Sequence, residues 1–195
     1  MYQNFPLFRS HLDLAHGYWK QLIQKGDWVI DATCGNGHDS LILASLIEEG
    51  GVIGLDIQEI ALQKTRQLLN THLPEEKIPS IHLFQQSHLS FPSLAYQHPI
   101  RVVVYNLGYL PGGNKSLTTQ TETTLPSIDA ALQLLQPGGI LSITCYPGHP
   151  EGAREETALI SQLSHLKSSE WNVCHHTFSN RLAAPSLILV QKTVK

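Results

Sequence analysis

Short apolar runs alternate with longer segments of helical periodicity along this chain, and this alternation constrains the fold most. Seven runs have the length of strands, and several are apolar throughout, as strands buried on both faces of a parallel sheet are. The expected strands lie at 28–32, 51–56, 81–84, 101–106, 139–146, 171–178 and 186–192. Helical periodicity occurs at 13–24, 39–49, 59–72, 125–135 and 151–165. The alternation predicts an α/β doubly wound fold with a mostly parallel sheet and helices on both faces.

The last two expected strands are joined by a short connection, SNRLAAP at 179–185. A parallel crossover needs about a dozen residues or more, so these strands are expected to be antiparallel neighbours in a hairpin. The prediction is therefore a Rossmann-like, seven-stranded sheet with a C-terminal antiparallel hairpin. The chain has 195 residues, the usual length of one domain, and we expect a single domain over 1–195.

Composition narrows the classes of partner and compartment. The formal net charge is −3 and 15% of the residues are charged, which argues against a broad basic face for long nucleic acid. The three cysteines, Cys34, Cys145 and Cys174, form no CxxC pair, which fits a reducing cytoplasm. The chain shows no signal-peptide pattern, no apolar run of transmembrane length, and no metal-ligand spacing among its eleven histidines. We expect a cytoplasmic protein without a membrane segment or a metal site.

The stretch DATCGNGHDS, at 31–40, follows the first expected strand and contains a glycine-rich turn. A dinucleotide fingerprint would need glycine at position 40, which is Ser40, and a phosphate-binding Walker loop would need a lysine that the stretch lacks. The carboxylate of Asp31 would also repel a phosphate. Asp56 ends the next expected strand, where an acid can accept hydrogen bonds from both ribose hydroxyls. The pattern D-x-x-x-G-x-G resembles motif I of class I methyltransferases, which use S-adenosylmethionine.

The fourth expected strand ends in NLGY, at 106–109. Methyltransferases of this fold that act on amines end this strand in an N/D-P-P-aromatic motif, and Asn106 and Tyr109 occupy its first and fourth places. Leu107 and Gly108 replace the two prolines, so stacking on a purine is not assumed. An amine must react in its neutral form, and the Asn106 amide can accept a hydrogen bond and aim the lone pair.

Three strings, DATCGNGHDS, NLGYLPGGNKSLTTQTETT and YPGHPEG, together resemble the bacterial rRNA methylase family that includes the MnmM or YtqB-like wobble-uridine enzymes. The similarity runs from about Leu14 to Lys192. The resemblance implies methyl transfer from S-adenosylmethionine to the aminomethyl group of 5-aminomethyl-2-thiouridine at the tRNA wobble position. Nothing in composition or periodicity indicates that substrate.

Candidate site residues follow from the motifs and from the resemblance. The cofactor residues expected are Asp31, Cys34, Gly35, Asn36, Gly37, His38, Asp39, Asp56, Ile57, Ser87, His88 and Asn106. The catalytic residues expected are Asn106, Tyr109 and His149. The substrate residues expected are Leu107, Gly108, Pro111, Gly112, Gly113, Lys115, Thr119 and Tyr146.

Further polar residues have less specific interpretations. Lys115 is a candidate phosphate contact, assisted by the hydroxyls of Thr118, Thr119 and Thr121, and Arg154 and Arg181 are candidates for the same positive patch. His149 is expected to orient substrate or relay a proton, and Glu151 to cap the helix that follows it. His16 is interpreted as a helix-surface histidine.

Several functions remain open from the residues alone. The first is methylation of an amine in the tRNA anticodon loop, with a homodimer as one way to widen the RNA footprint. The alternatives are an rRNA methyltransferase, a methyltransferase of a small-molecule or protein amine, which the mildly acidic charge favours, and a non-catalytic adenosine-binding module. The NLGYLPGG string argues against the last, because a binding module needs no methyl-acceptor site.

Overall fold

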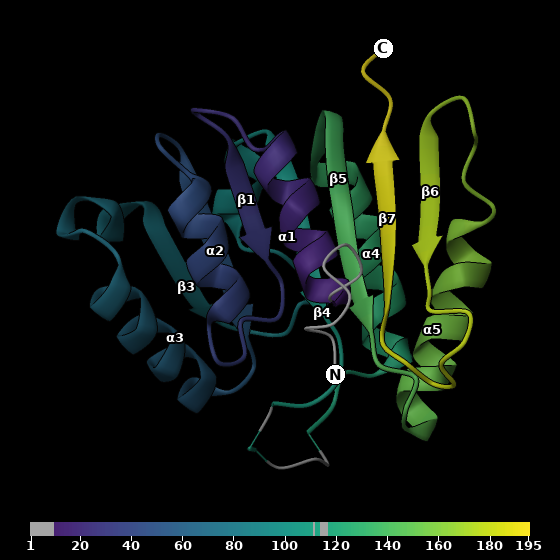
Figure 1. Cartoon of the computed structure of the whole chain (residues 1–195). Helices are drawn as coiled ribbons and strands as arrows, with labels where there is room; N and C mark the ends of the chain where they lie inside the picture. The colour runs from purple at the N-terminus through teal and green to yellow at the C-terminus, as the bar shows by residue number, and fades with distance from the viewer. Residues whose placement is uncertain (1–9, 111, 114–116) are drawn as a thin grey trace.

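The computed structural model describes residues 10–110, 112–113 and 117–195. Within these residues seven strands form one sheet in the order β3-β2-β1-β4-β5-β7-β6 (Figure 1). Strands β1 to β5 pair in parallel, and β7 runs antiparallel to both β5 and β6. The strands are β1 (Trp28–Asp31), β2 (Gly51–Asp56), β3 (Ile81–Gln85), β4 (Ile100–Asn106), β5 (Leu135–Cys145), β6 (Trp171–His176) and β7 (Ser186–Lys192). The predicted sheet and its C-terminal antiparallel pair are confirmed.

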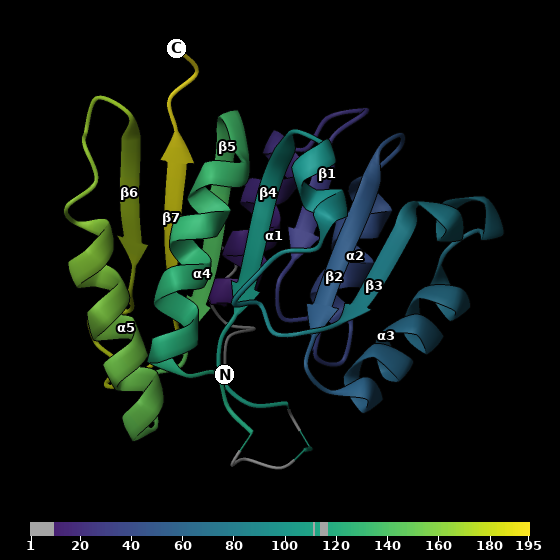
Figure 2. The same ribbon diagram turned by 180° about the vertical axis from the view of Figure 1, so that it is seen from behind.

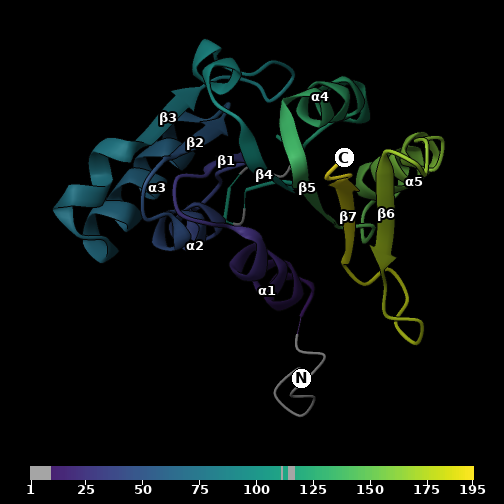
Figure 3. The same ribbon diagram turned by 90° about the horizontal axis from the view of Figure 1, so that it is seen from above.

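Helices cover both faces of the sheet, as Figures 2 and 3 show. On one face, α1 (His11–Leu22), α2 (His38–Leu46) and α3 (Glu59–His72) bury Trp19, Leu43 and Leu69 against the strands. On the other face, α4 (Thr121–Leu134) and α5 (Pro150–Leu163) bury Ile128 and Leu159. Two short 3-10 helices, η2 (Glu75–Ser80) and η3 (Ser93–Gln97), flank β3 and β4. Each face thus has its own apolar layer, because strands that are apolar throughout offer side chains to both.

Two elements begin four residues earlier than the periodicity predicts. Helix α4 starts at Thr121 rather than at position 125, because the carboxylate of Glu151 accepts a hydrogen bond of 2.9 Å from the Thr121 backbone N–H. Strand β5 starts at Leu135 rather than at 139, since Leu135 pairs with Ile100 before a register shift in β4. Both extensions depend on partners far away in sequence.

The carboxyl ends of the parallel strands meet at one edge of the sheet, at the bottom of Figure 1. Strands β1 and β4 lie side by side at the centre, and the helices that follow them, α2 and α4, lie on opposite faces. This is the topological switch point where open α/β sheets bind ligands. The ends of β1, β2 and β4 bring Asp31, Asp56 and Asn106 to this edge. No helix in the described ranges is long and apolar enough to cross a membrane.

Candidate active site

The glycine turn after β1 packs closely against α3. The backbone N–H of Gly37 donates to the carbonyl of Cys34 at 2.8 Å, and Gly37 has a φ of 86°. A Cβ atom at Gly37 would lie 2.7 Å from the Cα of Thr65, closer than carbon atoms approach without displacement. Only glycine satisfies both the left-handed backbone and this contact.

Asp31 lies fully buried beneath this turn. Its carboxylate accepts hydrogen bonds from the Ser40 hydroxyl at 2.5 Å and from the Thr33 backbone N–H at 3.1 Å. Burial, and then the charge of Asp39, raises the pKa of Asp31 to about 7. A cation bound above the turn would favour the ionised carboxylate.

Asp56, at the end of β2, connects the second strand to the turn. Its carboxylate accepts the backbone N–H of Gly35 at 2.9 Å and that of Gln58 at 2.9 Å. Burial raises the pKa of Asp56. Each carboxylate oxygen keeps a lone pair for a ribose hydroxyl, and the neighbouring Ile57 side chain is exposed at the rim.

Asn106, Asp39 and His16 form a hydrogen-bonded chain across three elements. The Asn106 amide nitrogen lies 3.0 Å from Oδ2 of Asp39, and Nε2 of His16 lies 2.7 Å from Oδ1 of Asp39. The backbone N–H of Asn106 donates to the Thr33 hydroxyl at 2.7 Å. The interpretation of His16 as a helix-surface histidine is therefore wrong, since the helical pattern alone does not reveal a buried acid on a neighbouring helix.

Tyr146 and His11 form a second contact between α1 and this edge. The ring of His11 meets Tyr146 edge-on, with Nε2 of His11 3.2 Å from the Tyr146 hydroxyl. Burial raises the pKa of Tyr146 to about 12 and lowers the pKa of His11. A Cβ atom at Gly108 would lie 3.9 Å from the Tyr146 ring, so this ring stands beside the NLGY segment.

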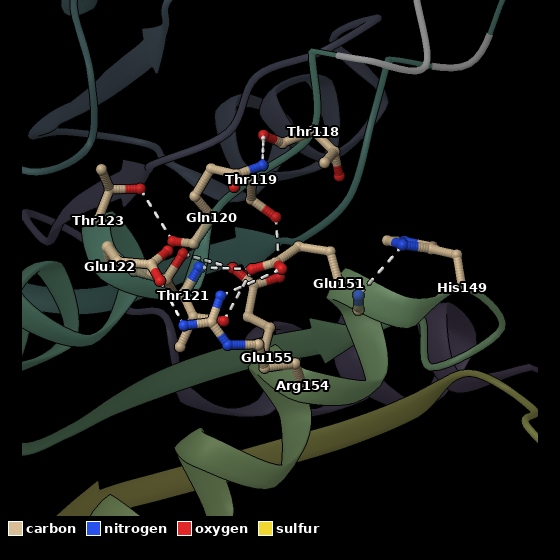
Figure 4. A network of polar contacts seen from close by, with 12 residues as sticks. Thr118, Thr119, Gln120, Thr121, Glu122, Thr123, His149, Glu151, Arg154 and Glu155 are labelled. Carbon is tan, nitrogen blue, oxygen red and sulfur yellow. Dashed lines mark hydrogen bonds and ion pairs between the residues drawn. The ribbon is translucent and has the colours of Figure 1, made fainter.

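Thr119, just before α4, links Gly108 to a carboxylate of α5 (Figure 4). Gly108 and Thr119 bond reciprocally: the Gly108 N–H donates to the Thr119 hydroxyl at 2.9 Å, and the Thr119 N–H donates to the Gly108 carbonyl at 3.0 Å. The Thr119 and Thr124 hydroxyls then donate to the buried carboxylate of Glu155 at 2.8 and 2.5 Å. We call Gly108, Thr119, Thr124 and Glu155 the loop clamp. Sequence reasoning missed Glu155, because its partners lie more than 30 residues away.

The polar network of Figure 4 changes the roles expected for Glu151 and Arg154. Glu151 accepts the backbone N–H and the hydroxyl of Thr121, so it caps α4 and not, as predicted, its own helix. The cap of α5 is His149, whose Nδ1 accepts the Gly152 N–H at 3.1 Å. Arg154 is paired with Glu122 and Glu151, which offsets its charge. The Thr119 and Thr121 hydroxyls donate to Glu155 and Glu151, so RNA would have to compete with these carboxylates, and the predicted RNA contact stays a prediction.

His149 faces the aromatic ring of Tyr109, with ring centroids 6.0 Å apart. Because Nδ1 accepts a hydrogen bond from a backbone N–H, the neutral ring carries its proton on Nε2. Nε2 is buried and has no hydrogen-bond partner within the described part of the chain. The neutral ring can donate from Nε2 but cannot accept there, which argues against the predicted proton relay.

A sequence profile of the family described as "Putative rRNA methylase" matches residues 52–192. The chain belongs to this rRNA methylase family. Over 188 residues, 92% of this chain and 68% of the relative, it is 40% identical to the chloroplastic tRNA (mnm(5)s(2)U34)-methyltransferase of Arabidopsis thaliana. The family resemblance noted from the sequence is confirmed.

Two solved structures resemble this methylase over nearly its whole length. A "putative rRNA-methylase" from Clostridium thermocellum superposes with a TM-score of 0.86 at 34% identity, covering 94% of this chain and 97% of that one. SMU.1697c, a "putative methyltransferase" from Streptococcus mutans in complex with SAH, superposes with a TM-score of 0.81 at 32% identity, covering 94% and 98%. These relatives share the fold of the methylase.

The third-strand candidates lie in different surroundings in this methylase. Ser87 accepts the Leu89 backbone N–H near the end of β3. The His88 ring instead lies buried against Tyr105 and α4, and burial lowers its pKa to about 4. The His88 ring is therefore turned toward α4, and a place for Ser87 and His88 at the adenine edge stays a prediction. Packing against α4 explains the difference.

The remaining candidates divide between turn, loop and surface. Cys34 is buried, and burial raises the pKa of its thiol, which fits a small residue packed in the turn. His38 is exposed at the start of α2, and Asn36 accepts a hydrogen bond from Lys64 at 3.3 Å. Arg181 lies 4.5 Å above the Phe178 ring in the β6–β7 connection. Pro111 and Lys115 lie outside the described residues. Arg154 does not support the predicted positive patch, because it is paired with two glutamates.

Proposed function

We propose that this methylase transfers a methyl group from S-adenosylmethionine to the aminomethyl group of 5-aminomethyl-2-thiouridine at the tRNA wobble position. The observation that carries the proposal is the Asn106 amide, held by Asp39 at the switch-point edge beside the glycine turn. The name of the Arabidopsis thaliana relative supports the uridine substrate. SMU.1697c, solved in complex with SAH, supports the cofactor.

Residues on three elements suit the cofactor. Gly35 carries no side chain at the turn, Asp56 offers carboxylate oxygens to ribose, and the exposed Ile57 offers an apolar wall for adenine. Asp31 and Asp39 place negative charge where a sulfonium and an ammonium would lie. The cofactor supplies an electrophilic methyl carbon; the rest of the catalysis is positioning by this chain.

Asn106 is suited to orient the amine that receives the methyl group. Its amide oxygen can accept an amine N–H, which leaves the nitrogen lone pair free to point along the line of displacement. The nitrogen gains a positive charge as the new C–N bond forms, and the carboxylate of Asp39 lies within one hydrogen bond of Asn106. The secondary ammonium product then loses its extra proton to solvent.

Substrate walls and the loop clamp complete the proposed acceptor site. Tyr109 and Tyr146 offer aromatic rings to a base turned out of an RNA loop. The buried Nε2–H of His149 offers a hydrogen bond to a carbonyl oxygen of the substrate. Gly112 and Gly113 lie on the same loop, where the absence of side chains suits close approach of substrate.

Methylation of rRNA is the second candidate, favoured by the family description that matches residues 52–192. The test uses methyl-labelled S-adenosylmethionine with tRNA and rRNA from cells lacking the enzyme, followed by digestion to nucleosides. For the wild-type enzyme, we expect label in a methylaminomethyl-uridine from tRNA. Asn106→Ala should lose this label, whereas Asn172→Ala, at an exposed position, should keep it. Label in rRNA alone would overturn the wobble-uridine assignment.

We further propose that the enzyme works in the cytoplasm on free tRNA, as a homodimer that widens its RNA footprint. Cys34, Cys145 and Cys174 are free thiols, which supports a reducing compartment. Light scattering of the purified protein with and without tRNA would test the dimer. A monomer that retains full activity at high dilution would contradict it.

A further inference from the structure

We propose that His16 is a positioning residue for methyl transfer: through Asp39 it fixes which side of the Asn106 amide meets the acceptor amine. The proposal rests on the proposed function, because it needs an amine as methyl acceptor. Helix α1 lies outside both the glycine turn and the NLGY segment, and the proposal gives it a role in the reaction.

The contacts determine the orientation of the Asn106 side chain. Asp39 accepts from both neighbours, with 2.7 Å to Nε2 of His16 and 3.0 Å to the Asn106 amide nitrogen. An ionised carboxylate has no proton to donate, so His16 must carry its proton on Nε2 and Asn106 must present its NH₂ group. The Asn106 amide oxygen is thereby turned away from Asp39, as an acceptor for an amine N–H.

The burial of Asp39 explains why His16 is needed. The Asp39 side chain is 8% exposed, and a carboxylate oxygen left there without a donor is costly. The His16 ring packs against the buried Trp19 of the same helix, with ring centroids 4.8 Å apart, so the donor itself is held in place. Without His16, Asp39 would rotate to find water or a new donor and would release the Asn106 amide.

Release of the amide has a direct chemical consequence. A flipped Asn106 would point its NH₂ group at the amine. The N–H groups of the amide and of the amine would then repel each other, or the amide would donate to the lone pair of the amine nitrogen and so block the nucleophile. The backbone of Asn106 stays fixed by the Thr33 hydroxyl, so only the side-chain orientation changes. The Asp39 carboxylate is still present in the variant, and the turn and Asp56, which make the other proposed cofactor contacts, are not altered, so cofactor binding should change little.

The kinetic test compares His16→Ala, His16→Gln and Lys20→Ala, the last an exposed position on the same helix. We expect His16→Ala to lower kcat at least about tenfold with the KM for cofactor within about threefold, because an orientation and not a binding contact is lost. His16→Gln should recover much of the rate through its own N–H donor. Equal rates in His16→Ala and Lys20→Ala would overturn the proposal.

An NMR measurement decides the inference without any substrate. In the wild-type protein, the His16 ring should be protonated at Nε2, and the Asn106 side-chain amide should shift in His16→Ala but not in Lys20→Ala. A bare Nε2 in the wild type, or an unshifted Asn106 amide, would overturn the inference. Should wild-type enzyme fail to methylate tRNA, the proposed function would fall while these spectra still decide the role of His16.

Discussion

At the scale of single residues, Asp31 combines a functional charge with a cost in stability. Burial moves its pKa from 3.8 to about 7 in the folded protein. Below about pH 4 the carboxyl is protonated in both the folded and the unfolded chain. Between about pH 4 and pH 7 the folded protein keeps a proton that the unfolded chain has lost, so stability falls as pH rises. Above that range both forms are ionised and the fall stops.

Asp31→Asn should therefore gain stability over the wild type as pH rises from about 5 to about 8, by an amount on the order of a few kcal/mol. The variant should also bind S-adenosylhomocysteine poorly, since it lacks the carboxylate. Urea unfolding at the two pH values and calorimetric titration measure both effects. Asp129→Asn, at an exposed position, is the control. A stability difference that is the same at both pH values would contradict the buried-acid account.

Gly37 and Gly17 offer a matched pair of glycine substitutions. Gly37→Ala would place a Cβ 2.7 Å from the Cα of Thr65 at a φ of 86°, so we expect a loss of about 2 kcal/mol or more and weak cofactor binding. Gly17 lies inside α1, and among the described residues no atom outside the nearby backbone of that helix lies within 4 Å of its would-be Cβ, so Gly17→Ala should stabilise the fold by about 0.5–1 kcal/mol. Thermal unfolding of both variants measures the two changes in stability. Equal changes in Gly37→Ala and Gly17→Ala would contradict this expectation.

At the scale of elements, the loop clamp is expected to support the proposed substrate site and not the cofactor site. Glu155→Ala removes the buried acceptor of the Thr119 and Thr124 hydroxyls. We expect a stability loss of about 2–3 kcal/mol and faster hydrogen exchange at the Gly108 and Thr119 amides. Affinity for S-adenosylhomocysteine should stay within about threefold, because the clamp does not touch the turn.

The control for the clamp is Glu170→Ala, whose exposed side chain pairs only with Lys167 among the described residues. That change should cost less than about 1 kcal/mol, as surface ion pairs do. If Glu155→Ala left the hydrogen exchange rate of the Gly108 amide unchanged, the Gly108–Thr119 pair would be held by contacts other than the clamp.

The sequence pattern predicts elements whose signals lie in neighbouring residues. It does not predict features that depend on side chains far away in the sequence. The apolar runs predicted the seven strands of the described residues, and GxG with a strand-end acid predicted the turn. The start of α4 was missed, because its cap comes from Glu151, 30 residues further along the chain. His16 was misinterpreted for the same reason, since its partner Asp39 lies on another helix. Motif I and NLGY could be recognised because the residues of each motif are contiguous in the sequence. Glu155 and His11 belong to no contiguous motif, so their contacts could not be predicted.

At the scale of the whole molecule, charge predicts weak dependence of RNA binding on salt. The net charge is −3, and Arg154 is paired with two glutamates. Few phosphate contacts are then expected, so a plot of log affinity for tRNA against log salt should have a slope of magnitude about 3 or less. Arg154→Ala should change the affinity by less than about twofold, and a steep slope that this variant flattens would contradict the expectation.

The central claim concerns one nitrogen on one uridine, and a defined substrate tests it most directly. Purified enzyme and S-adenosylmethionine would be incubated with an anticodon stem–loop carrying 5-aminomethyl-2-thiouridine, beside a matched stem–loop carrying 2-thiouridine. Mass spectrometry of the digested nucleosides should show a gain of one CH₂ on the aminomethyl nucleoside only, and none with Asn106→Ala. A gain on any other nucleoside, or none on this one while the enzyme binds its cofactor, would contradict the account.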